Sequence, residues 1–366
     1  MNIKIPLFKI YWDKNDIQAV SEVIKRGSYW AIGPEVEKFE KLIAEYVGTE
    51  HAVVFNSGTS ALHAILLAIN IKKGDEVIVP SMSFISTSNS VLFTGGKPVF
   101  ADIENRTFSL DDEDINKKIT RKTKAIIPVH YAGCPSYCIK KIRDIAEDKN
   151  IFLIEDAAAA LGAKIDQQKV GTFGDAAMFS FCQNKIITTG EGGVITTNSK
   201  KLYNKLKLLV SHGKMGGNYI SIGYNLRMAS MNAALGISQL MKIDKLIKMR
   251  RNIASKYNSQ LKNIKNIDLI LPPDHFFHVY WIYSILIEGN LKGKLKQHLL
   301  NSGVYSKLYY DPIHLTQYYK KLYSYSIGTL QNTEDFCNKS LSLPIFPSMK
   351  KEEINYIVQC IKELMI

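Results

Sequence analysis

The amino-acid sequence predicts an α/β protein with a large doubly wound domain and a smaller second domain. The chain has 366 residues, of which 46% are hydrophobic and 22% charged, a composition typical of a globular protein with a large core. Its first two-thirds alternate short β-branched runs with longer helical patterns, which indicates a parallel sheet with crossover helices. Near residue 245 the pattern changes, so we expect domains over residues 1–245 and 246–366.

The expected strands of the large domain are short apolar or β-branched runs bounded by polar and turn residues. One helix stands out over residues 35–47, where apolar side chains recur at helical spacing. We expect the strands at residues 52–55, 76–79, 98–101, 125–129, 151–154, 177–181 and 193–197.

The last third of the chain predicts a different arrangement. A helical pattern rich in Ala, Leu, Lys and Arg runs from residue 231 to about 261, across the expected boundary. Beyond it, residues 268–272 and 279–287 are expected to be strands of the smaller domain, and residues 352–365 its terminal helix.

The composition also bears on location and cysteine chemistry. No apolar run reaches the roughly 18 residues of a membrane span, and the first residues lack the apolar stretch of a secretory signal. We therefore expect a cytoplasmic protein without a membrane partner. The five cysteines are scattered and odd in number, which disfavours a disulfide framework. Cys134 and Cys138 lack the further ligands of a zinc site, so no metal is expected.

The formal net charge of +13 raises the question of nucleic-acid binding. The lysines are spread along the whole chain instead of forming one cluster, so we expect no nucleic-acid partner. An excess of positive charge also favours the approach of a small anionic substrate, such as a nucleotide diphosphate.

The first segment with chemical content covers residues 55–62. A strand ends there in a turn of small residues, which includes Ser57, Gly58 and Thr59, and a helix follows. Backbone N–H groups at a helix start bind phosphate well. The same pattern also fits an ordinary Ser or Thr helix cap without a ligand.

The second segment is an apolar strand that ends in Glu155 and Asp156. Carboxylates at the carboxyl end of a central parallel strand point into the crevice where such folds bind ligands. Asp156 is suited to pair with the pyridinium nitrogen of a cofactor. The alternative is a helix cap, because small helix-forming residues follow directly.

The third segment places Lys185 between a strand and a glycine-rich turn at residues 190–193. A partly desolvated lysine in this position is suited to form an imine with an aldehyde. Most lysines are solvated surface groups, but the glycines allow the backbone to approach a ligand closely.

The phosphate cup, the acid and the amine follow one another in the order of a fold-type I enzyme that uses pyridoxal 5'-phosphate (PLP). Here the chain resembles the DegT/DnrJ/StrS family of nucleotide-sugar aminotransferases, nearly from end to end. The most specific segment is the one around Lys185. The resemblance rests on residues 33–34, 39–40, 57–62, 74–80, 97–100, 128–130, 155–158, 184–193, 223–228 and 341–347.

The resemblance implies a fold and a role for each site residue. The large PLP-binding domain would hold a mixed, mostly parallel seven-stranded sheet. Lys185 would be the catalytic lysine bonded to PLP, Asp156 the partner of the ring nitrogen, and Phe84 the ring stacked on the cofactor. The phosphate would be bound by Gly58, Thr59 and Ser180, and by Asn225 of the neighbouring subunit, which implies a homodimer with shared active sites.

The resemblance also implies the reaction. The family aminates keto sugars linked to a nucleotide diphosphate, commonly with L-glutamate as donor, for surface polysaccharide or glycan synthesis. Trp30, Tyr310 and His314 fall in the family's substrate-lining segments, although such residues are as often core packing. Ala159 departs from the family, which commonly has Gln, His or Glu there, near the ring hydroxyl of the cofactor.

Three other interpretations remain open at this point. The C-3 dehydratase branch uses the same cofactor but has His in place of the lysine, so Lys185 speaks against it. An aminotransferase for a smaller phosphorylated ketone is a second alternative. A PLP-binding regulatory protein without turnover is a third, but the sequence contains no recognisable helix-turn-helix extension.

Overall fold

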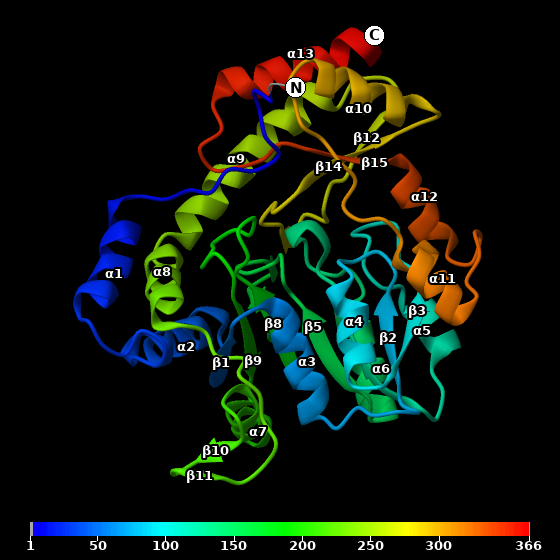
Figure 1. Cartoon of the computed structure of the whole chain (residues 1–366). Coiled ribbons are helices and arrows are strands. Elements are labelled where there is room, and N and C mark those ends of the chain that lie inside the picture. The colour runs from blue at the N-terminus through cyan, green and yellow to red at the C-terminus, as the bar shows by residue number, and fades with distance from the viewer. Residues whose placement is uncertain (1–2, 366) are drawn as a thin grey trace.

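The computed structural model describes residues 3–365 and has a large part built on a seven-stranded sheet, with a smaller part above it in Figure 1. The strand order in the sheet is β1-β9-β8-β5-β4-β2-β3. Only β9 runs antiparallel to its neighbours. The mixed, mostly parallel sheet is therefore confirmed, with strands β1 (His51–Phe55), β2 (Glu76–Pro80), β3 (Lys97–Ala101), β4 (Thr123–Ile126), β5 (Phe152–Asp156), β8 (Ala176–Ser180) and β9 (Gly193–Thr197).

Side chains alternate between the two faces of this sheet along each strand, and helices bury both faces. In β1, Val53 and Phe55 join one apolar cluster, whereas Ala52 and Val54 join the other. The first cluster is covered by α3 (Gly58–Ala68), α4 (Ser86–Phe93) and α7 (Lys200–Val210). The second is covered by α2 (Pro34–Val47), α5 (Asp112–Lys118), α6 (Ile139–Lys149) and α8 (Ser230–Leu240).

The smaller part packs three helices on an antiparallel sheet of order β12-β14-β15. Ile5, from the start of the chain, belongs to the same apolar core. The expected boundary at residues 245/246 falls in the first turn of a continuous helix, and it remains a prediction. The elements are α9 (Ile243–Leu261), β12 (Ile267–Leu269), β14 (Tyr283–Ile287), α10 (Leu291–Asn301), β15 (Ser340–Leu343) and α13 (Lys351–Met365).

The expectation of one helix over residues 231–261 is wrong, because α8 ends at Leu240 and α9 begins at Ile243. No glycine or proline marks this break. Lys242, between the two helices, forms ion pairs with Asp13 at 3.0 Å and Asp16 at 2.7 Å, at the start of α1 (Lys14–Lys25). A contact between distant parts of the chain thus stabilises the break.

The two strands expected after residue 261 are shorter than predicted. The first ends at Leu269, before Pro272 and Pro273, which have no N–H to donate to a strand partner. The second begins only at Tyr283. Residues 279–282 instead follow the large part, with the Val279 N–H donating to Gly133 O at 3.0 Å.

Several shorter elements lie outside the two main sheets. A hairpin of β10 and β11 projects beyond α7 at the bottom of Figure 1, whereas α11 and α12 lie beside β3. Within residues 3–365 no helix combines the length and the apolarity of a membrane span. The remaining elements are β6 (Lys164–Ile165), β7 (Gln168–Lys169), β10 (Lys214–Met215), β11 (Asn218–Tyr219), β13 (Phe276–Phe277), α11 (Gln317–Tyr323), α12 (Gln331–Lys339), and the 3₁₀ turns η1 (Tyr131–Gly133) and η2 (Ile313–Leu315).

Candidate active site

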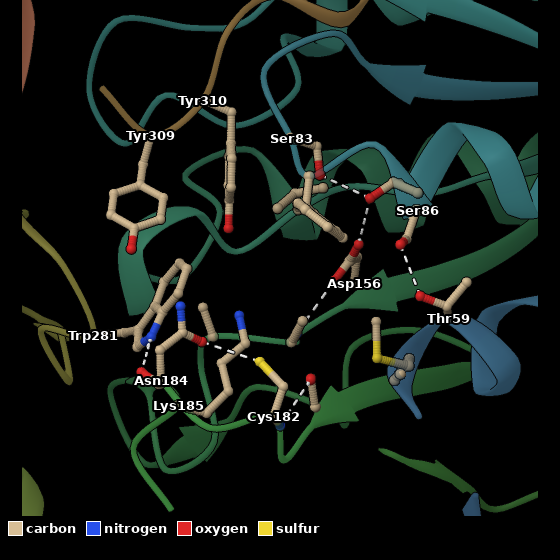
Figure 2. Close-up of a pocket in the computed structure, with 18 of the residues that line it drawn as sticks. Thr59, Ser83, Ser86, Asp156, Cys182, Asn184, Lys185, Trp281, Tyr309 and Tyr310 are labelled. Atoms are coloured by element: carbon tan, nitrogen blue, oxygen red, sulfur yellow. Dashed lines mark hydrogen bonds between the residues drawn. The ribbon is translucent and has the colours of Figure 1, made fainter. Parts of the chain in front are cut away.

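A cavity of about 400 Å³ lies at the carboxyl ends of β5 and β8. This is the edge at which open α/β sheets bind their ligands. Its walls come from the segments that follow β1, β2, β4, β5 and β8, and from two segments of the smaller part, around Trp281 and around residues 307–310. Figure 2 shows the side chains from these walls pointing toward a common space.

The start of α3 forms one end of the cavity. Ser57 caps this helix, and its Oγ accepts from the Ser60 N–H at 3.0 Å. The N–H groups of Gly58 and Thr59 precede the hydrogen-bonded part of the helix, so they are available to an anion. Gly58 lies so close to β8 that an added Cβ would be 3.2 Å from the Ser180 Cβ. The structure thus brings Gly58, Thr59 and Ser180 together, as the phosphate cup requires.

A second helix start lies beside the first. Thr59 Oγ1 and Ser86 Oγ, from the first turn of α4, are 2.7 Å apart. Both residues line the cavity. Two hydroxyl groups and the positive ends of two helix dipoles therefore meet at this end, an arrangement that favours a phosphate group.

Asp156 ends β5, and its carboxyl lines the cavity. Oδ2 accepts from Thr87 Oγ1 at 2.7 Å, and Oδ1 accepts from the Ala158 N–H at 3.2 Å. Burial raises the pKa of this carboxyl above its ordinary value, while the two hydrogen bonds and the Lys185 charge act in the opposite direction. The carboxyl is held in place, and a positive group in the cavity would stabilise its charge.

Glu155, the neighbour of Asp156, points to the opposite face of the strand, as alternation requires. Its fully buried carboxylate accepts from the N–H groups of Gly171, Phe173 and Gly174, each at 2.8 Å. It also bonds His130 Nε2 at 2.9 Å. Because His130 Nδ1 accepts from the Ser136 N–H, Nε2 carries the proton and donates it to Glu155. Glu155 thus holds the end of β5 to its surroundings.

Lys185 lies in the loop between β8 and β9, and its amine points into the cavity. Burial lowers the pKa of this amine, whereas Cys182 and Asp156 act to raise it. A lowered pKa makes the unprotonated, nucleophilic form more accessible. In Figure 2 the amine lies between the indole of Trp281 and the carboxyl of Asp156.

Aromatic rings and one cation complete the wall opposite β5. The Phe84 and Tyr310 rings are 5.8 Å apart, and Phe84 remains 56% exposed. The Tyr309 ring lies 5.4 Å from Trp281 and carries the Lys307 amine 4.1 Å above its centre. All of these residues line the cavity.

The arrangement fits PLP. An amine of lowered pKa suits an aldehyde, a buried carboxyl suits a ring nitrogen, and a helix start with free hydroxyls suits a phosphate. Phe84, at the cavity wall, has the exposed ring that a stacked cofactor needs. The small side chain of Ala159 lines the cavity and offers no polar contact there.

Three residues from the sequence prediction lie outside this cavity. Asn225 is exposed near the base of the β10–β11 hairpin, and Trp30 is 46% exposed between α1 and α2. His314 is fully buried and bonds Ser81 Oγ at 2.6 Å and Glu334 at 3.1 Å. Both ring nitrogens of His314 are therefore engaged, and its placement does not support a substrate contact.

The cavity also contains residues that the sequence alone does not indicate. Thr87, Trp281 and Lys307 carried no local signal, because each reaches the cavity from a different part of the chain. His130 belongs to one of the segments that resemble the family, and the structure shows it as a hydrogen-bond partner of Glu155. Within residues 3–365, no group of three or more His, Cys, Asp or Glu side chains is placed to bind a metal.

The chain is similar to known proteins over nearly its whole length. The profile of the DegT/DnrJ/EryC1/StrS aminotransferase family matches residues 11–362. A GDP-perosamine synthase from Vibrio cholerae is 34% identical, over 98% of this chain and 98% of that protein. The structure superposes on PseC of Helicobacter pylori, an aminotransferase of pseudoaminic acid biosynthesis, with a TM-score of 0.93, 31% identity and 99% coverage of both chains.

A third relative is known with the cofactor. A Streptococcus pneumoniae protein solved in its PLP form has a TM-score of 0.91 and 28% identity, over 100% of this chain and 99% of that one. These matches cover nearly the whole chain and confirm the resemblance, the fold class and the enzyme class expected from the sequence. This chain is a member of the DegT/DnrJ/EryC1/StrS aminotransferase family.

Proposed function

We propose that this aminotransferase uses PLP to move an amino group from L-glutamate to a keto sugar carried on a nucleotide diphosphate. The observation that carries the proposal is one cavity in which the Lys185 amine and the Asp156 carboxyl lie beside the start of α3. Similarity to a GDP-perosamine synthase and to an aminotransferase involved in pseudoaminic acid biosynthesis favours a sugar substrate and a role in polysaccharide or glycan synthesis.

The residues around the cofactor have distinct tasks. When bound, PLP supplies an aldehyde that takes up the amino group and a ring that stabilises the electron pair at the reacting carbon. Lys185 would hold the aldehyde through Nζ, and the same atom would move the proton at the reacting carbon. Asp156 provides the negative charge that keeps a ring nitrogen protonated. The hydrogen bond from Thr87 keeps this carboxyl oriented and charged.

The rest of the cavity positions the ligands. Gly58, Thr59 and Ser180 would bind the cofactor phosphate, and Phe84 would cover one face of its ring. The rings of Tyr309 and Tyr310 exclude water and offer faces for the sugar or the base. Lys307 forms no ion pair with the part of the chain that the structure describes, so its ammonium is free to bind the diphosphate.

The proposed assembly is a homodimer with shared active sites. Asn225 is exposed and lies outside the cavity of its own chain, which supports a contact with the site of a partner. The β10–β11 hairpin and the residues that follow it expose Tyr219, Ile220 and Ile222, by 72%, 56% and 82%. Burial of these apolar side chains would stabilise a dimer.

One experiment tests the whole proposal. The absorbance of the purified protein with PLP is recorded before and after addition of L-glutamate, and then with a panel of nucleotide-linked 3-keto and 4-keto sugars. We expect glutamate to abolish the visible band of the lysine-bound cofactor and one sugar to restore it. Restoration only by a smaller phosphorylated ketone would identify that alternative substrate instead. A band that no amino donor changes would contradict the proposal.

A further inference from the structure

The indole of Trp281 lies directly against the amine of Lys185. Nζ is 3.6 Å from the centre of the ring, closer than any other cation–π contact between described residues. The Trp281 Nε1–H donates to the carbonyl of Asn184 at 2.6 Å. Asn184 directly precedes Lys185, so the ring is tied to the loop that carries the lysine (Figure 2).

The backbone around Trp281 is also held on both sides. On one side, the N–H groups of Val279 and Ile282 donate to Gly133 and Ala132, at 3.0 and 3.3 Å. On the other side, Arg250 Nη1 donates to the Trp281 carbonyl at 3.2 Å. With a side chain that is only 5% exposed, Trp281 cannot follow the lysine when the lysine moves. The ring is therefore a fixed surface beside a mobile amine.

The lysine needs such a surface. In the proposed function Lys185 is bonded to the cofactor in one state and free in the other, while the cofactor carries the amino group. The free ammonium then lies in a pocket where burial disfavours its charge. The face of an indole attracts an ammonium group by electrostatics without a counter-ion, and more strongly when water is excluded.

We propose that Trp281 is a positioning residue that receives the ε-ammonium of Lys185 whenever this lysine is free, and holds Nζ on the face of its ring. This inference relies on the proposed function only in taking Lys185 as the reactive amine. The ring keeps the amine within reach of the reacting carbon and competes with Asp156, which attracts the same charge from the opposite side.

Several other groups act on the Lys185 amine. Asp156 and Cys182 both favour its charged form. The ring differs from them because its attraction does not change with pH. An apolar side chain without an aromatic ring would not attract the ammonium form. Such a replacement should therefore make the amine titrate at a lower pH. The titratable side chains that line this cavity with Lys185 are His130, Tyr131, Asp156, Cys182, Glu191, Lys307, Tyr309 and Tyr310.

The test measures how fast acetic anhydride labels Lys185 in the cofactor-free protein at several pH values, read by peptide mass spectrometry. Trp281→Leu keeps an apolar wall but removes the ring, and Trp281→Phe keeps a ring but removes the N–H. Below the titration midpoint we expect Trp281→Leu to label about threefold faster or more than the wild type, because a weaker cation–π contact leaves more neutral amine. Trp281→Phe should behave like the wild type. Lys200, whose amine lies 4.6 Å above Tyr203, serves as the internal reference.

Two results would overturn the proposal: equal labelling of Trp281→Leu and the wild type, or equal acceleration in both variants. If Trp281→Leu does not fold, Trp281 fluorescence gives a second measurement. The chain has three tryptophans, and Trp12 and Trp30 are exposed and replaceable by Phe. The emission of Trp281 should then change with pH, and Lys185→Met should abolish this step; a titration without a step would refute the contact. Neither measurement requires amino transfer, so a failure of the proposed function would remain distinguishable.

Discussion

Thr87 Oγ1 donates a hydrogen bond of 2.7 Å to Asp156 Oδ2, from the first turn of α4 to the end of β5. The same hydroxyl lies 2.7 Å from Ser83 Oγ, so Thr87 can donate to Asp156 while it accepts from Ser83. All three side chains are buried. The carboxyl proposed to face the cofactor ring is thus supported by hydroxyl groups from the segment that follows β2 and from the first turn of α4.

We expect Thr87→Val to weaken PLP binding by roughly 10-fold or more, because a hydrogen bond to a charged group contributes about 1.5–3 kcal/mol. The loss also raises the pKa of Asp156, since Thr87 lowers it. Fluorescence titration with PLP measures the effect. Thr94→Val, at the other end of the same helix, removes a hydroxyl that bonds only the Val91 carbonyl and should leave affinity unchanged. Equal losses in the two variants would contradict this prediction.

Asp156→Asn should make the cofactor-free protein more stable at neutral pH while it lowers activity about 10²- to 10³-fold. Burial raises the pKa of Asp156 above its ordinary value of 3.8, so the folded protein binds this proton more tightly than the unfolded chain does. The stability that this carboxyl contributes is therefore complete below pH 3.8 and is lost as pH rises through the folded-state pKa.

The variant lacks this loss, and its free energy of unfolding should exceed that of the wild type by on the order of 1 kcal/mol at pH 7. Urea unfolding at several pH values measures the difference, which should shrink as the pH is lowered. A variant that is less stable than the wild type at pH 7 without cofactor would refute the argument. Added PLP should stabilise the wild type more than the variant.

Glu155→Gln should destabilise the protein by about 3 kcal/mol, because it replaces a fully buried carboxylate that accepts from three N–H groups and from His130. A glutamine has one acceptor oxygen, and its NH₂ group would face donors. Urea unfolding measures the loss, and Glu147→Gln on the exposed face of α6 is the matched control. If both variants lose the same stability, Glu155 does not hold the end of β5 as inferred.

The parts of the site that could be predicted from the sequence are those with a local signal. Lys185 and Asp156 each follow an apolar strand, and carboxyl ends of parallel strands meet at one edge. Trp281 and Lys307 could not be found in this way, because folding brings them to the cavity from about 96 and 122 residues after Lys185.

The same distinction applies to the fold. The seven strands of the large sheet are predicted by their composition, and no predicted bound differs from the observed one by more than three residues. The break after Leu240 depends on ion pairs of Lys242 with Asp13 and Asp16, more than 220 residues away in the sequence. The helical periodicity of the sequence continues through this break and therefore predicts one helix.

Lys307→Met should weaken the binding of the nucleotide sugar roughly 10- to 100-fold, if its ammonium binds the diphosphate. The reaction of the PLP enzyme with L-glutamate should proceed at the normal rate, because that donor has no diphosphate. Stopped-flow measurement of the two half-reactions separates these effects. Lys200→Met removes the same charge from an amine over Tyr203, outside the cavity, and is the control. A variant impaired only with glutamate would contradict this assignment.

Mixed dimers test whether Asn225 acts in the site of its partner. Lys185→Ala and Asn225→Ala should each be nearly inactive alone. In a dimer of one chain of each kind, the site with an intact Lys185 receives an intact Asn225 from the other chain, so one complete site forms. Random mixing makes half of the dimers mixed, and activity should recover to about a quarter of the wild-type value. If Asn225 served its own chain, no mixed dimer would contain a complete site, and mixing the variants would restore nothing.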